Sequence, residues 1–335
     1  MLCDKSDYFN SKDKYIVKIL VLGGFGFLGG RIAQYFLNRE HQVIQGTSRD
    51  LESKNFFLDG SEVLRTYWND REKLNEICKN IDLIIHASGM NAADCFNDPV
   101  EALNVNAVAT ANILQSAIKM NVKKFLYVSS IHVYKDKLEG NISELDHPTN
   151  LHPYATSQRA GEDVVLWAHQ NKLIDGVVVR ISNGFGVPIS KDVNCWMLLV
   201  NDLCRQAVEQ KKLVLNSDGL QIRNFISISE ICSALEFILC KLPSNQLTIN
   251  KSPINIGGKN SLSVLDMAKL IQSRCKAIIG YTPDLFVTGK NSKEEMLQLD
   301  FKTNKLENLG YSYNHTNIEE LDNLLMFCSN NFSKK

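Results

Sequence analysis

The stretch that most constrains the fold of this chain is Lys18–Gly30, which reads KILVLGGFGFLGG. Its apolar run Ile19–Leu22 is typical of a strand buried on both faces of a parallel sheet. Three glycines follow at the spacing GxxGxxG, and Arg31–Asn38 then has helical periodicity. A strand, a glycine turn and a helix start in this order form an anion site, because glycine lets the backbone approach a pyrophosphate and the helix N-terminus offers free N–H groups. The residues of the turn expected to contact a dinucleotide are Gly23, Phe25, Gly26, Phe27, Leu28 and Gly29.

The end of the next strand bears on the choice of cofactor. His41–Gly46 reads as that strand, and NAD-selective folds place a carboxylate at its end to bind the ribose hydroxyls. Here Ser48 and Arg49 follow it instead, and both can hold a 2′-phosphate, which favours NADP(H). The alternative is that Asp50 binds the ribose slightly later in the chain and that the cofactor is NAD(H).

Composition excludes several classes of partner. The chain has 335 residues, 44% of them hydrophobic, with 37 basic and 37 acidic residues, so nothing indicates nucleic acid or an anionic membrane as a partner. The nine cysteines form no CxxC pair and no metal-ligand spacing, which is typical of reduced cysteines in a cytosolic protein. No stretch approaches the roughly 18 apolar residues of a membrane span. We therefore expect a cytoplasmic protein without a metal, with Met1–Lys14 as a loose polar tail.

The chain from Glu62 to Ile181 alternates between strand and helix patterns, which predicts an α/β fold with a Rossmann-like, doubly wound parallel sheet. Ligands of such sheets bind at the carboxyl ends of the strands, where the turns Ala87–Gly89 and Ser129–Ser130 fall. The expected strands are Glu62–Trp68, Ile81–His86, Phe125–Val128 and Gly176–Ile181, and the expected helices are Asp70–Lys79, Asp98–Met120 and Tyr154–Asn171, with a loop at Asn141–Pro153.

Beyond Pro188 the alternation loosens and predicts a smaller C-terminal substrate lobe. Its pattern weakens further in the charged C-terminal third. The expected helices here are Trp196–Lys211, Ser229–Lys241 and Ser263–Arg274, and the expected strands are Leu213–Leu215, Arg223–Ile228 and Pro253–Gly258.

Three positions suggest acid/base chemistry next to a hydride donor. Tyr154 can exchange a proton with a substrate oxygen, and Ser130 at the end of its strand can hold that oxygen. A phenol has a pKa near 10, so a cation usually lowers it, and a lysine one helical turn further on would do so. Position 158 is glutamine, which can hydrogen-bond a ribose but carries no charge, and Arg159 points about 100° away from it. His132 is a further titratable group or a neutral loop histidine.

These features together resemble the extended short-chain dehydrogenase/reductase family, which contains nucleotide-sugar epimerases, dehydratases and reductases. The resemblance runs from about Ile16 to about Tyr311, and it rests on the order of the motifs rather than on any one of them. The motifs are 23–29 (GGFGFLG), 86–89 (HASG), 98–106 (DPVEALNVN), 128–134 (VSSIHVY), 153–158 (PYATSQ), 180–188 (RISNGFGVP), 221–226 (QIRNFI), 254–258 (INIGG) and 300–302 (DFK).

The resemblance implies roles for individual residues. Tyr154 matches the catalytic tyrosine, Ser130 the residue that polarises the substrate oxygen, and Gln158 stands where the family has its active-site lysine. Arg223 matches an arginine that grips the nucleotide-sugar phosphates. The further cofactor contacts expected are Ala87, Ser88, Gly89, Asn106, Tyr154, Gln158 and Ile181, and the substrate contacts are Met90, Asn91, Ser130, His132, Asn183 and Arg223.

Two classes of function remain open at this point. The first is an NAD(P)-dependent epimerase or 4-keto-sugar reductase; dehydratases carry two acidic residues after the serine, where this chain has Ile131 and His132. The second is a catalytically weak binding protein that regulates a partner, which the uncharged Gln158 suggests. The resemblance also implies a dinucleotide domain at 15–186 with returns near 223–258, a substrate lobe at 187–222 and 259–335, and a homodimer through the helices Asp98–Met120 and Tyr154–Asn171.

Overall fold

A seven-stranded parallel sheet forms the centre of the computed structural model, which describes residues 16–52, 54–242, 252–289 and 298–333. The strand order is β11-β7-β5-β4-β1-β2-β3, so the chain winds outward in both directions from β1. This is the doubly wound, Rossmann-like α/β fold that the sequence predicts. The strands are β1 (Lys18–Leu22), β2 (Gln42–Thr47), β3 (Glu62–Arg65), β4 (Leu83–His86), β5 (Lys124–Ser130), β7 (Asp175–Ile181) and β11 (Ile254–Ile256).

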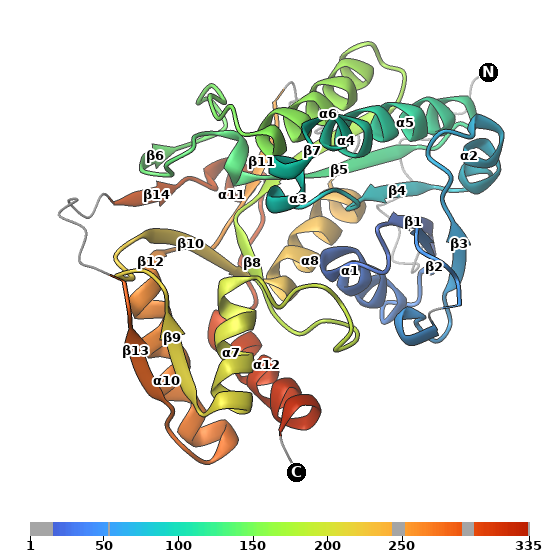
Figure 1. Ribbon diagram of the computed structural model, residues 1–335. Helices are drawn as coiled ribbons and strands as arrows, with labels where there is room; N and C mark the ends of the chain where they lie inside the picture. Colours follow the sequence, from blue (N-terminus) through green and yellow to red (C-terminus); the bar gives the residue numbers. More distant parts are fainter. Residues whose placement is uncertain (1–15, 53, 243–251, 290–297, 334–335) are drawn as a thin grey trace.

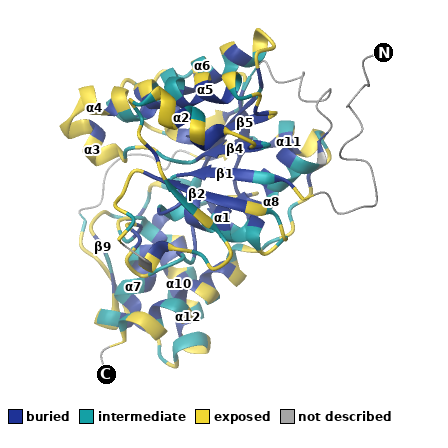
Figure 2. Ribbon diagram, turned by 90° about the vertical axis from the view of Figure 1, so that its right-hand side faces the viewer, coloured by how far each residue is buried: buried dark blue, intermediate teal, exposed yellow. Residues whose placement is uncertain are grey.

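Helices cover both faces of this sheet and make three layers (Figure 1). On one face lie α2, α4, α5 and α6, and on the other lie α1 and α8. Figure 2 shows the central strands β1, β4 and β5 as almost entirely buried, as expected of apolar parallel strands, whereas the edge strand β3 is partly exposed. The helices are α1 (Phe27–Leu37), α2 (Arg71–Cys78), α4 (Pro99–Leu103), α5 (Ala109–Lys119), α6 (Pro153–Gln170) and α8 (Ile228–Glu236).

A smaller lobe built from the C-terminal half packs below the sheet in Figure 1 and has its own apolar core. It contains α7 (Leu199–Gln210), β9 (Lys212–Leu215), α10 (Val264–Ile279), β13 (Asp284–Val287) and α12 (Asn317–Phe332). A small three-stranded sheet with the strand order β12-β10-β8 lies between the two parts. Its strands are β8 (Asn183–Phe185), β10 (Ile222–Ser227) and β12 (Ser261–Ser263).

Three predictions about elements were incomplete. The single helix predicted over 98–120 is α4 and α5 joined by a π-helical turn, Asn104–Val108. The predicted loop at 141–153 begins inside β6 (Gly140–Ile142), which pairs with β14 (Leu299–Phe301) about 160 residues later. The predicted 229–241 helix ends as α8 at Glu236 and continues as a π-helical turn to Lys241. Elements without a sequence prediction are α3 (Ala92–Asn97), β8, β12, β13, β14, α11 (Asn304–Asn308) and α12.

The described residues carry no feature of a membrane span or a disulfide. No helix among them is long and apolar enough to cross a bilayer. Their eight cysteines are all free thiols, and none of them belongs to a metal-binding group in this part of the chain. The predicted tail at 1–14 lies outside the described residues.

Candidate active site

The turn between β1 and α1 can form only with glycine. Gly23 has φ of +81°, a left-handed conformation, and its N–H donates to the Gly46 carbonyl at 2.9 Å. A methyl group on Gly29 would lie 2.2 Å from the Gly23 carbonyl oxygen, so the first turn of α1 packs directly on the glycine turn. The GxxGxxG spacing therefore reflects close backbone contact, because a side chain at Gly29 would collide with the turn.

The start of α1 fits a pyrophosphate. Gly26 is the N-cap, no side chain caps the helix, and no acidic residue lies in its first turn, so the first amides and the helix dipole can receive an anion. The Phe25 side chain instead packs in the core, 5.4 Å from the Phe56 ring, which leaves its backbone as the part that can meet a ligand. The residues present thus suit the dinucleotide that the sequence predicts.

Gln45 stabilises this turn, and the sequence analysis missed it. It is fully buried on β2; its Nε2 donates to the Gly24 carbonyl at 2.9 Å, and its Oε1 accepts from the Ser61 hydroxyl at 2.8 Å. Beyond β2, Ser48 and Arg49 are exposed, and the Arg49 guanidinium lies 5.4 Å from the centre of the Phe56 ring. Because Phe56 also contacts Phe25, the exposed Arg49 side chain lies near the glycine turn.

The turn after β4 lies against the glycine turn. A methyl group on Gly23 would meet Ala87 and the Ser88 nitrogen within 3 Å. The neighbouring Asn106, in the π-helical turn, is buried and accepts the Met90 N–H at 2.8 Å through Oδ1. Its Nδ2 donates to Ser157 of α6 at 2.9 Å, so this asparagine joins the β4 turn to the helix that carries Tyr154.

Tyr154 and Ser130 come together as the sequence predicts for an acid/base pair. Tyr154 is half-buried in the first turn of α6, whose N-cap His152 accepts the Tyr154 N–H at 3.1 Å. Burial raises the pKa of Tyr154, while a hydrogen bond with Ser130 acts in the opposite direction. Ser130 ends β5 beside Ile181 of β7, whose side chain is in the core.

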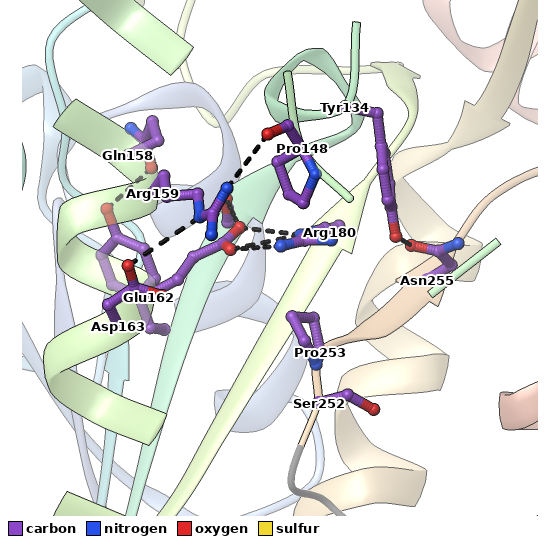
Figure 3. A network of polar contacts seen from close by, with 12 residues as sticks. Tyr134, Pro148, Gln158, Arg159, Glu162, Asp163, Arg180, Ser252, Pro253 and Asn255 are labelled. Atoms are coloured by element: carbon purple, nitrogen blue, oxygen red, sulfur yellow. Dashed lines mark hydrogen bonds and ion pairs between the residues drawn. The ribbon is translucent and has the colours of Figure 1, made fainter. Parts of the chain in front are cut away.

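Gln158 lies one turn after Tyr154 and is buried, with 4% of its surface exposed. Its Oε1 accepts a hydrogen bond from the Tyr127 hydroxyl at 2.7 Å. Arg159 points elsewhere: it donates to the Pro148 carbonyl at 3.0 Å and lies 3.8 Å from Asp163 (Figure 3). Arg159 therefore does not replace a cation at position 158, in agreement with the helical geometry expected from the sequence.

A buried ionic network centred on Glu162 fixes α6 to the sheet (Figure 3). Glu162 accepts from the Ser129 hydroxyl at 2.5 Å and from the Arg180 guanidinium at 2.6 Å. Arg180 lies 4.5 Å from the centre of the Tyr134 ring, and the Tyr134 hydroxyl donates to Asn255 of β11 at 2.7 Å. Because Ser129 is the neighbour of Ser130 in β5, the network also fixes the end of the strand that carries Ser130.

His132, Asn183 and Arg223 lie close to one another, and the His132 N–H donates to the Ser130 hydroxyl oxygen at 3.2 Å. The protein around the His132 ring and the charge of Arg223 lower the pKa of that imidazole, whereas a hydrogen bond with Asn183 raises it. Arg223 is oriented by Gln221, whose Oε1 accepts from it at 2.8 Å. Asn91 instead caps α3, where its side-chain Oδ1 accepts the Asp94 N–H at 3.0 Å.

The family comparison agrees with this arrangement. The sequence pattern of the NAD dependent epimerase/dehydratase family matches residues 19–257. The chain belongs to this family. The match includes the glycine turn, Tyr154 and Arg223, and it ends at Gly257, just beyond β11.

Individual members of the epimerase/dehydratase family resemble the chain at low identity. A provisionally named UDP-glucose 4-epimerase of Methanocaldococcus jannaschii is 25% identical over 301 residues, which cover 88% of this chain and 92% of that protein. A dTDP-D-glucose 4,6-dehydratase of Dictyostelium discoideum is 27% identical over 297 residues, which cover 78% of this chain and 63% of that longer protein.

Solved structures show the same fold. An epimerase from Methanothermobacter thermautotrophicus superimposes with a TM-score of 0.77 at 19% identity, over 94% of this chain and 93% of that one. A UDP-glucuronic acid 4-epimerase from Bacillus cereus, in complex with UDP-glucuronic acid and NAD, gives a TM-score of 0.74 at 23% identity, over 93% and 99% of the two chains.

Proposed function

We propose that this protein is a nicotinamide-dependent reductase that converts the 4-keto group of a nucleotide-linked sugar into a hydroxyl. The observation that carries the proposal is the half-buried Tyr154 phenol, hydrogen-bonded to Ser130 and one helical turn from the uncharged Gln158. Membership of the epimerase/dehydratase family supports the substrate class, because the relatives named above are enzymes of nucleotide sugars.

The protonation state of Tyr154 favours reduction over epimerisation. Burial is the largest influence on this phenol and raises its pKa, so the phenol keeps its proton at neutral pH. A reductase uses such an acid, whereas an epimerase must first remove a proton from a sugar hydroxyl and needs a base. A bound reduced dinucleotide supplies the hydride to the carbonyl carbon. Tyr154 gives its proton to the carbonyl oxygen, which Ser130 holds, and the product is the alcohol.

We assign the substrate's diphosphate to Arg223. Burial lowers the pKa of this arginine, and an anionic ligand would compensate for the water that its guanidinium has lost. His132 and Asn183 beside it would contact the sugar, with Met90 and Asn91 as further expected contacts. The residues after Ser130 are Ile131 and His132, so the site offers no carboxylate pair there for eliminating water.

We favour NADP(H) over NAD(H) because of the end of β2. Ser48 and Arg49 are exposed there, and Phe56 lies under the Arg49 guanidinium at 5.4 Å from its ring centre. A 2′-phosphate would form a charge-assisted hydrogen bond with this guanidinium. Titration with NADPH and NADH should give tighter binding of NADPH, and Arg49→Ala should remove most of that difference. Equal affinity of the wild type for both would favour NAD(H).

The activity is tested with purified protein and a panel of 4-keto nucleotide sugars. We expect loss of reduced-nicotinamide absorbance with at least one of them, and no such loss with Tyr154→Phe. The matched control is Tyr67→Phe, since Tyr67 is an exposed tyrosine far from Ser130 in the sequence. Interconversion of 4-hydroxy epimers without net loss of reduced cofactor would instead identify an epimerase.

Gln158 favours one alternative, a binding protein of low activity that regulates a partner. A lysine in place of Gln158 would add the cation that lowers the pKa of a nearby phenol. The regulatory alternative holds if the wild type binds the dinucleotide but turns over no sugar while Gln158→Lys does. Turnover by the wild type excludes it.

We also propose a homodimer through α4, α5 and α6. Figure 2 shows exposed residues on α3 and α4. The exposed large apolar residues of this region lie on α3, α4, the π-helical turn and α6: Phe96, Val100, Leu103, Val108 and Trp167. Val100 is 70% exposed and Trp167 58%, and a second copy would cover such a surface. Light scattering should give twice the chain mass, and Val100→Glu should give the monomer. A cytoplasmic location and the domain boundaries remain predictions.

A further inference from the structure

The amide of Gln158 is buried with only one end satisfied. Its Oε1 accepts the Tyr127 hydroxyl at 2.7 Å, and the residue is 4% exposed. Within the described parts of the chain, no hydrogen-bond acceptor lies on its Nε2. An amide N–H that has no acceptor in the protein is available as a hydrogen-bond donor to a ligand.

The Tyr127 hydroxyl decides which way the amide faces. A hydroxyl has one proton to donate, and the Asn106 carbonyl, which also lies within reach, is farther away at 3.3 Å. That carbonyl also accepts from the Thr110 hydroxyl at 2.8 Å. The Tyr127 proton therefore points to Gln158, where only a carbonyl oxygen can accept it. The Gln158 nitrogen is left on the opposite side.

The free Nε2 points to the turn after β4. It lies 3.1 Å from the place that a methyl group on Gly89 would occupy, and Asn106 Oδ1 lies 3.1 Å from the same place. Ala87 and Ser88 of this turn adjoin the glycine turn. Tyr154 lies one helical turn before Gln158 on α6. This donor thus lies beside the turn that adjoins the glycine turn, on the helix that carries Tyr154.

We propose that Tyr127 is a positioning residue for the cofactor: its hydroxyl holds the Gln158 amide so that Nε2 donates to a ribose hydroxyl oxygen of the bound dinucleotide. This inference rests on the proposed function, because it requires a dinucleotide beside Gly89. The Tyr127–Gln158 pair supplies a neutral donor there. It adds no charge near Tyr154.

Binding of NADPH tests the proposal without turnover. We expect Gln158→Met to weaken binding about three- to tenfold, as for the loss of one neutral hydrogen bond. Tyr127→Phe should weaken it by a similar factor, because the freed amide can turn. The double variant should bind no more weakly than Gln158→Met alone, since Tyr127 acts through Gln158.

The matched control is Tyr134→Phe, which removes another buried tyrosine hydroxyl whose partner is Asn255 at 2.7 Å. This control should leave NADPH affinity unchanged. Independent and multiplying losses in the double variant, or an unchanged affinity in Tyr127→Phe, would overturn the role of Tyr127. A wild type that binds neither NADPH nor NADH would defeat the proposed function, and this inference with it.

A second measurement covers the case in which Tyr127→Phe is too unstable for titration. The side-chain amide signals of Gln158 in a ¹⁵N spectrum can be assigned by their disappearance in Gln158→Met. We expect NADPH to shift them in the wild type, because Nε2 gains an acceptor. Signals that do not move while NADPH binds would refute the contact.

Discussion

His86 shows how burial fixes the charge of one residue in this molecule. It ends β4 with 1% of its surface exposed, and burial lowers its pKa to about 3. Its Nε2 lies 3.0 Å from the Thr110 hydroxyl oxygen and its Nδ1 lies 2.9 Å from that of Ser88. Because Thr110 donates onward to Asn106, Nε2 carries the proton and Nδ1 accepts from Ser88. The neutral ring thus holds the β4 turn.

This neutral histidine predicts a loss of stability in acid. The unfolded chain binds a proton at this residue below about pH 6.5, whereas the folded chain does so only near its lowered pKa of about 3. The stabilising contribution is complete above about pH 6.5 and falls by up to about 1.4 kcal/mol per pH unit as the pH decreases through that window.

Urea unfolding between about pH 7 and about pH 4 measures this slope. In His86→Gln the free energy of unfolding should fall less steeply with decreasing pH than in the wild type, by the equivalent of up to one bound proton. The variant should nevertheless be less stable than the wild type at neutral pH. The matched control is His147→Gln, which changes an exposed histidine. Equal slopes in the wild type and His86→Gln would show that His86 is charged or accessible in the folded chain.

At the scale of elements, the buried Glu162–Arg180 pair joins α6 to β7. Arg180 would keep its charge without a partner in Glu162→Gln, in a place where only 5% of its side chain is exposed. We expect a loss of about 3–5 kcal/mol in the free energy of unfolding. The control is Asp322→Asn, which breaks the 2.7 Å pair with Arg274 at the surface and should cost less than about 1 kcal/mol. Similar losses in the two variants would contradict this account.

The glycine turn gives a second prediction about an element, and it separates two adjacent glycines of α1. In Gly29→Ala the new methyl group meets the Gly23 carbonyl oxygen at 2.2 Å, which is backbone and cannot move aside. In Gly30→Ala it meets the end of the Ile189 side chain at 2.6 Å, which can change rotamer. Gly29→Ala should abolish dinucleotide binding, and Gly30→Ala should weaken it less. Titration with NADPH and thermal unfolding of both variants measure this difference.

Elements with a strong local pattern were predictable, and those held by distant partners were not. The parallel strands and the helices around them follow from continuous apolar runs and helical periodicity. By contrast, β8 has only three residues and pairs with β10, and β13 pairs with β9 about 70 residues earlier. Neither short segment carries enough residues for a pattern of its own.

The same limit applied to the candidate site. The glycine turn, Ser130 and Tyr154 could be found from motifs, and the structure places Ser130 and Tyr154 together. Gln45 and Tyr127 could not, because each is a single residue inside an ordinary strand. Their roles depend on which atoms lie opposite them: a carbonyl of the glycine turn for Gln45, and the Gln158 amide for Tyr127.

At the scale of the whole molecule, Glu320 connects the last helix to the glycine-turn helix. It lies in α12, 3% exposed, and accepts the Val187 N–H at 3.0 Å and the Ser229 hydroxyl. Arg31 of α1 lies 4.0 Å from it and donates to the Val187 carbonyl at 3.1 Å. One carboxylate thereby holds together the C-terminal lobe, the segment after β8, and the helix that would bind the pyrophosphate.

Glu320→Ala should therefore reduce both stability and dinucleotide affinity, although position 320 is about 290 residues from the glycine turn. It leaves the half-buried Val187 N–H without an acceptor and Arg31 without its counter-charge, so we expect a loss of about 3–5 kcal/mol in the free energy of unfolding. Glu319→Ala changes the exposed neighbour on the same helix and should cost less than about 1 kcal/mol. Urea unfolding measures the stability of the two variants, and NADPH titration measures their dinucleotide affinity. If Glu320→Ala lowers stability but binds NADPH as the wild type does, α12 supports the lobe without positioning α1.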